Sequence, residues 1–204
     1  MGSFFRTRWF IGSALIVWLC VVGLGFIVLM RFGATPGAIG DIPTSWPSSS
    51  RMIPDPDRAT LLMFAHPRCP CTRASLAELE KVMAQCQGLV TAHVLFFIPD
   101  RADRAWLNTD VRQMASAIPG VHVSDDLNAL EARRFGGVTS GQVVLYRSNG
   151  RLLFSGGITA ARGHQGDNPG ETDLVALIHG ERNSRGEFLV FGCPLLDPKV
   201  CRER

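Results

Sequence analysis

Apolar and polar residues follow different patterns in three parts of this 204-residue chain. Residues 9–30 are apolar and carry no charge, residues 32–58 are polar and rich in proline, and residues 59–182 have the mixed pattern of a folded domain. Within that domain, short apolar runs typical of buried strands alternate with segments whose apolar residues recur at helical spacing. Strands are expected at 60–65, 90–98, 121–124, 142–146 and 151–154, and helices at 75–87, 101–117, 126–135 and 171–179.

The order of these elements predicts an α/β fold. Strands that alternate with helices pair in parallel through helical crossovers, and the last two strands, joined by Asn149-Gly150, form an antiparallel hairpin. The result is a mixed sheet flanked by helices over residues 59–182. Ser75-Leu76-Ala77-Glu78 fits a capping box at the start of the first helix, and an earlier start near Thr72 is the alternative. Residues 183–204 are expected to form a tail that packs on this domain.

The apolar stretch at 9–30 predicts a membrane-spanning helix. At 1.5 Å per residue, a helix of this length spans roughly 30 Å, the thickness of the apolar part of a bilayer. No convincing cleavage site follows it, so the sequence favours an uncleaved anchor over residues 1–31 rather than a cleaved signal peptide. We therefore expect a single-pass protein of the inner or plasma membrane.

Basic residues around this span indicate its orientation. Arg6 and Arg8 precede it, and after Arg31 no basic residue follows until Arg51. The positive-inside rule then favours an N-terminus in the cytoplasm and a domain on the periplasmic or other extracytoplasmic side, where disulfides persist. Residues 32–58, with their prolines and serines, are expected to be an extended linker that holds the domain away from the membrane.

Charge and glycine patterns argue against two classes of function. The formal net charge of +3 gives no excess of basic residues for a nucleic acid to bind. The chain also has no P-loop and no G-x-G-x-x-G sequence after a strand. The sequence therefore indicates neither a nucleic-acid partner nor a nucleotide cofactor.

Cys69-Pro70-Cys71 lies where the first expected strand passes into a helix. A thiol at a helix N-terminus meets the positive end of the helix dipole and unpaired N–H groups, which stabilise the thiolate and lower the pKa. Arg68 and Arg73 are expected to add to this effect. Pro70 restricts the loop, and a disulfide between cysteines one residue apart closes a small ring. A permanent local disulfide is the competing interpretation, although it would remove little chain entropy.

Residues 61–79, LLMFAHPRCPCTRASLAEL, resemble the active-site segment of thioredoxin-like proteins, especially the membrane-anchored extracytoplasmic thiol–disulfide oxidoreductases. In that family an apolar strand leads to W-C-x-x-C and a helix. The resemblance implies a thioredoxin-like fold, a redox-active disulfide as the only cofactor, and a protein thiol or disulfide as partner. It implies the attacking role for Cys69. Thr72 falls where the second cysteine belongs, and the resolving role is inferred for Cys71.

The resemblance continues through residues 135–158, FGGVTSGQVVLYRSNGRLLFSGGI, where the family places a cis-proline facing its active site. Here the corresponding stretch, residues 138–141, reads VTSG and has no proline. Because that proline positions substrate and keeps metals from the thiols, its absence favours a second interpretation, a copper(I) carrier. Cys69 and Cys71 are soft ligands suited to copper(I), and His66 or His164 is expected to complete the site.

Other residues have two interpretations each. Cys193 and Cys201 are expected to form a structural disulfide that closes a loop in the tail. The alternative is a second redox pair that passes electrons to Cys69, and it requires the tail to fold back over the cysteine loop. His164, in the glycine-rich stretch 162–170, is either a polar turn residue or a proton shuttle for Cys69.

Overall fold

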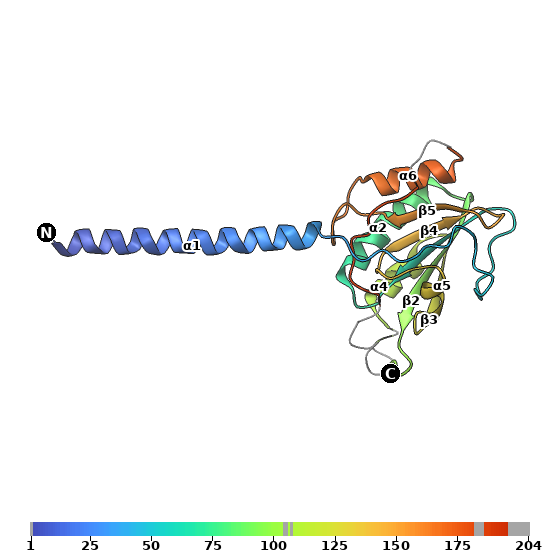
Figure 1. The fold of residues 1–204 in the computed structure, drawn as a ribbon, viewed down its shortest axis with the longest axis horizontal. Helices are drawn as coiled ribbons and strands as arrows, with labels where there is room; N and C mark the ends of the chain where they lie inside the picture. The colour runs from blue at the N-terminus through green and yellow to red at the C-terminus, as the bar shows by residue number, and fades with distance from the viewer. Residues whose placement is uncertain (1, 104–105, 107, 182–185, 196–204) are drawn as a thin grey trace. The chain divides into compact units, whose positions relative to one another are not determined.

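The computed structural model of the protein describes residues 2–103, 106, 108–181 and 186–195, with side chains in the first helix from Trp9 onward (Figure 1). The chain divides into two compact units, Met1–Thr35 and Pro36–Arg204. The first unit contains one helix, and the second contains every strand of the described part of the chain.

The first unit is helix α1, Gly2–Ala34. Its segment Trp9–Ala34 is long and apolar enough to cross a membrane, and its large apolar side chains are exposed. Since exposed apolar surface is unfavourable in water, this helix is suited to a lipid environment. The predicted apolar N-terminal helix is thus confirmed, and it extends three residues beyond the predicted boundary at residue 31.

Five strands form the mixed sheet of the second unit (Figure 1). The order β3-β2-β1-β4-β5 places β1 at the centre, parallel to β2 and antiparallel to β4. The predicted mixed sheet is confirmed, and so is the hairpin, whose Gly150 has a positive φ of 80° and donates its N–H to the Arg147 carbonyl. The strands are β1 Ala59–Ala65, β2 Val90–Ile98, β3 Val121–Leu127, β4 Gln142–Tyr146 and β5 Leu152–Gly157.

The described helices of this unit are α2 Pro70–Gln85, α4 Asp110–Ala117, α5 Leu130–Arg134 and α6 Pro169–Ile178. Helix α4 confirms the C-terminal part of the helix expected at 101–117, whereas residues 104, 105 and 107 lie outside the described residues. Helix α6 confirms the helix expected at 171–179. Its N-cap is Asn168, whose side chain accepts a hydrogen bond from the Glu171 N–H at 2.9 Å.

The capping box predicted at Ser75 and Glu78 is wrong. Helix α2 begins five residues earlier, at Pro70, so Ser75 lies inside the helix. There its hydroxyl donates to the Cys71 carbonyl one turn back, which is a common arrangement for a serine in a helix. Glu78 is fully buried and engages other partners, which are described below.

The helix predicted from Asp126 also begins at a different residue. Strand β3 continues through Leu127, and α5 starts only at Leu130. The carboxylate of Asp126 accepts hydrogen bonds from the N–H groups of Glu131 and Ala132 at 2.8 and 2.9 Å. Asp126 therefore satisfies the first N–H groups of α5 from the end of a strand instead of belonging to the helix.

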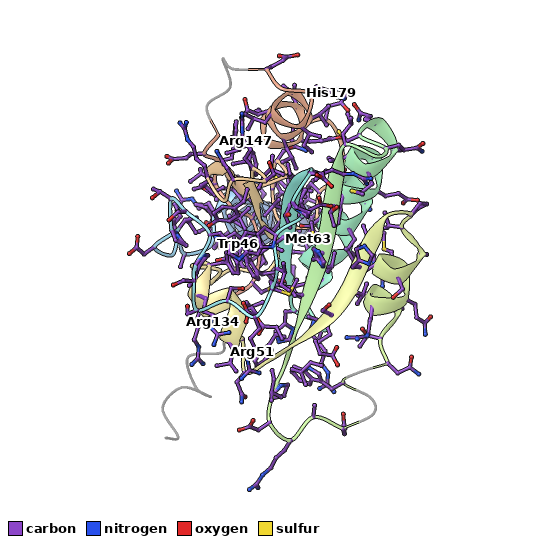
Figure 2. The ribbon with its side chains drawn as sticks, turned by 90° about the vertical axis from the view of Figure 1, so that its right-hand side faces the viewer. Trp46, Arg51, Met63, Arg134, Arg147 and His179 are labelled. Carbon is purple, nitrogen blue, oxygen red and sulfur yellow. The ribbon has the colours of Figure 1, made fainter. Side chains whose placement is uncertain are left out.

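The sheet carries one hydrophobic core on each face. Because successive strand residues point to opposite faces, Met63 of β1 belongs to one core and Leu62 and Phe64 belong to the other. Apolar residues of α2, α4 and α6 cover the first core. Figure 2 labels Met63 of the first core and Trp46 of the second. The second core is covered by the short helix α5 and by residues from outside the helices and strands, namely Ile42, Trp46, Met52 and Leu195.

Residues 36–58, expected to be a linker, lie against the second core. The ring of Trp46 is 4.9 Å from the ring of Phe135 and 5.3 Å from that of Tyr146. The Tyr146 hydroxyl donates to the Pro43 carbonyl at 2.8 Å. Since α5 has only five residues, this segment supplies much of the cover that the face requires. It therefore packs on the domain, while the predicted domain boundaries stay a prediction.

Candidate functional site

The junction between β1 and α2 places Cys69 directly before a helix. The Cys69 N–H donates to the His66 carbonyl at 3.1 Å, and an extended backbone (φ −91°, ψ 120°) makes Cys69 the N-cap of α2. Pro70 occupies the first turn, where a missing N–H removes no helical hydrogen bond. That turn contains no acidic residue, and no side chain caps it. The positive end of the helix therefore acts on the Cys69 thiol without a competing anion.

A third cysteine, Cys193, reaches the same place from the C-terminal segment. The Sγ atoms of Cys69, Cys71 and Cys193 all lie within 4.8 Å of one another. The Cys193 carbonyl accepts a hydrogen bond from the Ser140 N–H at 2.9 Å. Cys69 and Cys71 are 3% and 6% exposed, whereas Cys193 is half-buried. The tail thus folds back over the cysteine loop, which is the arrangement that an electron relay requires.

The three cysteines of this cluster are free thiols. The structural disulfide predicted from the sequence joins Cys193 to Cys201, and Cys201 lies outside the described residues. That pairing stays a prediction. The neighbours that the structure gives to Cys193 are Cys69 and Cys71.

Hydrogen bonds make Cys69 the most acidic thiol of the cluster. Burial raises the pKa of Cys69, but the Cys193 side chain and the N–H groups of Cys193, Thr72 and Cys71 all donate to its sulfur. Together these donors hold the pKa of Cys69 below that of an ordinary cysteine. The predicted effect of the helix start is therefore present, and a second segment of the chain adds to it.

The two neighbouring thiols are shifted in the opposite direction. Burial and the negative charge of Cys69 raise the pKa of Cys71. Burial, a hydrogen bond to Cys69 and the charges of both neighbours raise the pKa of Cys193 to about 12. Cys69 is consequently the thiol of the cluster that loses its proton most readily, and Cys71 and Cys193 hold theirs more tightly.

The two arginines expected to favour the thiolate are paired with carboxylates. Arg68 lies 3.8 Å from Asp103, and its guanidinium stacks over the ring of Trp106 at 4.3 Å. Arg73 forms an ion pair with Asp110. Arg68 and Arg73 thus each have a carboxylate partner, and neither is among the causes that lower the pKa of Cys69.

Thr72 stands where the resemblance expects a second cysteine, and Ser140 lies in the stretch where it expects a cis-proline. Their hydroxyl groups form a hydrogen bond with each other. The hydroxyl oxygens of Thr72 and Ser140 are 2.7 Å apart and fully buried. The Ser140 hydroxyl also accepts a hydrogen bond from the His66 N–H at 2.9 Å. No peptide bond is cis in the part of the chain that the structure describes. A side-chain hydrogen bond therefore fastens the stretch 138–141 to the cysteine loop.

The histidines predicted to support the site lie outside the sulfur cluster. His66 packs its ring against Phe97 and Trp106, at centroid distances of 5.6 and 5.3 Å. His164 is exposed, and its Nδ1 is 3.0 Å from the Arg162 carbonyl. Among the described residues, the group close enough to share a metal ion contains the three cysteines and no histidine. The roles predicted for His164 have no geometric support in this arrangement.

Sequence reasoning brought Cys193 near Cys69 only in the alternative of an electron relay, and it did not single out Arg162. The Arg162 guanidinium donates to the Gly192 carbonyl beside Cys193, and its charge lowers the pKa of Cys71 against the larger opposing effects. The available signal was Gly192-Cys193-Pro194, in which a cysteine lies between a residue without a side chain and a residue without an N–H. Such a sequence suits close approach to another backbone, but it does not identify which one.

The fold resembles that of solved structures, but no function follows from the comparisons. Neither a protein-family model nor a curated protein matches the chain. A hypothetical protein from Sinorhizobium meliloti 1021 has 18% identity and a TM-score of 0.59, over 77% of this chain and 96% of that one. An uncharacterized conserved protein from Geobacillus kaustophilus has 13% identity and a TM-score of 0.56, over 81% and 94%.

A secreted disulfide oxidoreductase of Mycobacterium tuberculosis also aligns, at 18% identity, over 60% of this chain and 81% of that one. Its TM-score of 0.42 is too low to support an argument. The class of fold rests on topology, namely the order β3-β2-β1-β4-β5 with cysteines at the end of the central strand. This is the thioredoxin-like fold that the sequence predicts.

Proposed function

We propose that this protein is a membrane-anchored thiol–disulfide oxidoreductase in which Cys69 attacks a substrate disulfide and Cys71 is the predicted resolving thiol. The observation that carries the proposal is the lowered pKa of Cys69 at the N-cap of α2, beside two thiols whose pKa values are raised. Thiolates attack disulfides and thiols do not, so this arrangement supplies one nucleophile and reserves its partners for the second step.

The reaction proceeds by two exchanges. The Cys69 thiolate attacks one sulfur of the substrate disulfide, the substrate S–S bond breaks, and the other substrate sulfur leaves as a thiolate. A second thiol of the cluster then loses its proton, attacks the Cys69 sulfur and releases the remaining substrate thiolate. Burial and the Cys69 charge raise the pKa of Cys71. The mixed disulfide removes that charge and so promotes the second step.

The partner in this proposal is a protein that carries an accessible disulfide or dithiol. Helix α1 holds the protein in the membrane, and the domain faces the extracytoplasmic side, where substrate disulfides persist.

Alkylation and turnover of the full-length protein in detergent test this proposal. The pH dependence of alkylation by iodoacetamide, followed for each cysteine by mass spectrometry, is expected to give Cys69 a midpoint below the value of about 8.5 for a free cysteine. Turnover is measured as reduction of insulin by dithiothreitol. We expect Cys69→Ser to reduce it to the rate without protein, because a serine hydroxyl does not attack disulfides.

Cys20→Ser is the matched control, since Cys20 belongs to the other unit of the chain. It is expected to leave the turnover rate as it is in the natural sequence. Alkylation of Cys69 with the midpoint of a free cysteine, or turnover that survives Cys69→Ser, would rule out the proposed mechanism.

Copper(I) binding is the second candidate function, and the three clustered sulfurs favour it. Thiolates are soft ligands that select copper(I), and three sulfurs within 4.8 Å of one another suit a single ion. Cys193 takes the place that the sequence gives to His164. In a copper(I) titration under argon against a competing chelator, Cys193→Ser should weaken binding and His164→Ala should not. Equal affinity for the natural sequence and Cys69→Ser would exclude a copper site here.

A further inference from the structure

The C-terminal segment Gly186–Leu195 is built into the domain at two places. Near its start, Glu187 forms a parallel bridge with Ser155 of β5. Near its end, Pro194 forms an antiparallel bridge with Thr139. A segment held at both ends gives the residues near its second bridge a defined position.

Backbone hydrogen bonds fix the part of this segment that carries Cys193. The Ser140 N–H donates to the Cys193 carbonyl at 2.9 Å, and the Leu195 N–H donates to the Val138 carbonyl at 2.8 Å. Leu195 is 1% exposed and belongs to the second core of the sheet. Cys193 is therefore held between a backbone pairing and a buried anchor.

Gly192 allows the close approach that brings Cys193 to the cluster. A Cβ atom at this position would overlap the Ser140 carbonyl oxygen, so only glycine fits without a shift of the backbone. The Arg162 guanidinium donates to the Gly192 carbonyl. The segment thus presses its backbone against the stretch 138–140 next to Cys69.

Cys71 and Cys193 meet Cys69 from different directions. Cys69 is the extended N-cap of α2 and Cys71 lies in its first turn, so a disulfide between them closes a small ring that contains Pro70. Cys193 approaches from a separate segment, so its bond to Cys69 closes no such ring. It is also the most exposed of the three residues, which favours contact with a bound substrate.

We propose that Cys193, rather than Cys71, resolves the mixed disulfide on Cys69, so that the first oxidised product is a Cys69–Cys193 disulfide. The inference rests on the proposed oxidoreductase function. The Cys193 thiol gives its proton to water, and its sulfur attacks the Cys69 sulfur. The Cys69–substrate S–S bond breaks, a Cys69–Cys193 bond forms, and the substrate thiolate leaves. The protein loses two electrons, and the substrate disulfide, which gains them, becomes two thiols.

Disulfide mapping after a single turnover tests this inference. The reduced full-length protein in detergent is mixed with one equivalent of glutathione disulfide, quenched with acid and N-ethylmaleimide, and digested with trypsin. Cleavage after Arg68 and Arg73 places Cys69 and Cys71 together on the peptide 69–73, whereas Cys193 lies on the peptide 186–199. A Cys69–Cys71 disulfide is internal to one peptide, and a bond to Cys193 joins two.

The expected product is the joined pair of peptides, and Cys71→Ser is expected to retain it. In Cys193→Ser, the Cys69–glutathione mixed disulfide should last about tenfold longer or more, since the oriented intramolecular thiol is gone. The serine in Cys193→Ser keeps a hydroxyl that can donate to Cys69. The rate of mixed-disulfide formation, measured in the same samples, shows whether the substitution changes the first step. Cys20→Ser serves as the matched control for the loss of a thiol.

The outcomes separate this inference from the function on which it rests. If no mixed disulfide forms on Cys69 in the natural sequence, the proposed function fails. If the mixed disulfide forms and resolves to an internal Cys69–Cys71 bond, or resolves at the natural rate in Cys193→Ser, only the role of Cys193 is overturned. Cys193→Ser is uninformative if its melting temperature lies well below that of the natural sequence. The Cys71→Ser variant then still tests the inference, because a digest of Cys71→Ser without the disulfide-joined peptides 69–73 and 186–199 contradicts it.

Discussion

The β1–α2 junction and the C-terminal segment Gly186–Leu195 supply cysteines to one cluster, yet they are specified in different ways. At the junction, neighbouring residues determine the structure: an apolar run, a turn, a cysteine and a proline lead directly into a helix. The C-terminal segment has no helix or strand of its own, and its position depends on bridges to residues 32 and 55 positions earlier in the chain. Local patterns place the nucleophile, and distant pairing places its neighbour.

Residues 36–58 behave like the C-terminal segment in this respect. They too lack long strands and helices, and they too are positioned by the domain on which they pack. They differ in what they supply, because the N-terminal segment contributes aromatic bulk and the C-terminal segment contributes a thiol and hydrogen bonds. Substitutions in residues 36–58 should therefore lower the free energy of unfolding as core substitutions do. Substitutions in the C-terminal segment should also change the reactivity of Cys69.

The largest effect is expected for Trp46→Ala. This change removes ring contacts to Phe135 and Tyr146 and a hydrogen bond from the indole N–H to the Met52 carbonyl at 3.2 Å. We expect the free energy of unfolding to fall by about 3 kcal/mol, as for other large-to-small changes in a core. Urea unfolding of the full-length protein in detergent measures it.

Ile53→Ala is the control within the same segment. Ile53 is 82% exposed, so its truncation should change the free energy of unfolding by less than about 0.5 kcal/mol. Similar small losses for both variants would mean that the segment is a spacer, as the sequence alone suggests, and the comparison would fail for residues 36–58.

A smaller effect on stability, with a separate effect on the site, is expected for Gly192→Ala. The added methyl group meets the Ser140 carbonyl oxygen, so the segment must move, at a cost of about 2 kcal/mol. Moving Cys193 weakens the donors that oppose the effect of burial on the pKa of Cys69. The pH midpoint of Cys69 alkylation should therefore be higher in Gly192→Ala than in the natural sequence.

Gly163→Ala is an informative comparison for this change. A Cβ atom at Gly163 meets no other atom within 4 Å, although its positive φ of 70° makes a side chain unfavourable there. It should cost stability without shifting the alkylation of Cys69. If both variants leave the alkylation midpoint unchanged, the C-terminal segment does not tune the nucleophile.

These contrasts explain how much of the molecule the sequence predicts. The strands, the order of elements and a helix after the cysteine loop follow from apolar runs and turn residues close together in the chain, although α2 starts at Pro70 and not at Ser75. The covering role of Trp46 does not, because a proline-rich segment shows no periodicity even when one of its residues is a core residue. The extra length of β3, and the capping of α5 by Asp126, depend on pairing with β2.

The site divides along the same line. Cys69 and Cys71 are predictable because the chemistry of a helix N-terminus depends on sequence neighbours. The position of Cys193 is not, since the sequence predicts a tail packed on the domain but leaves open whether it reaches the cysteine loop. The arginines mislead for a related reason: the carboxylates that pair with Arg68 and Arg73 lie 35 and 37 residues further along the chain. Formal charge near a motif is therefore a poor guide to the field at its sulfur.

Glu171→Gln is expected to change the free energy of unfolding least. It tests whether Glu78 of α2 and Glu171 of α6 share a proton. Glu78 of α2 is fully buried, binds Lys81 and accepts the Gly166 N–H at 2.8 Å. Burial, and the hydrogen bond and charge of Glu78, raise the pKa of Glu171 from 4.5 to about 7. Because this pKa is raised by folding, the contribution of Glu171 to stability is fully present below pH 4.5 and is lost as the pH rises through 7.

A glutamine at this position stays neutral and can still donate to Glu78. Glu171→Gln should therefore raise the free energy of unfolding by about 1 kcal/mol at pH 8 and leave it nearly unchanged at pH 5. Urea unfolding at several pH values gives the difference between the two proteins. Glu80→Gln, an exposed change on the same helix as Glu78, should give a difference that does not vary with pH. A stabilisation by Glu171→Gln that is equal at pH 5 and pH 8 would mean that Glu78 and Glu171 do not share a proton, and that α2 and α6 are joined by packing alone.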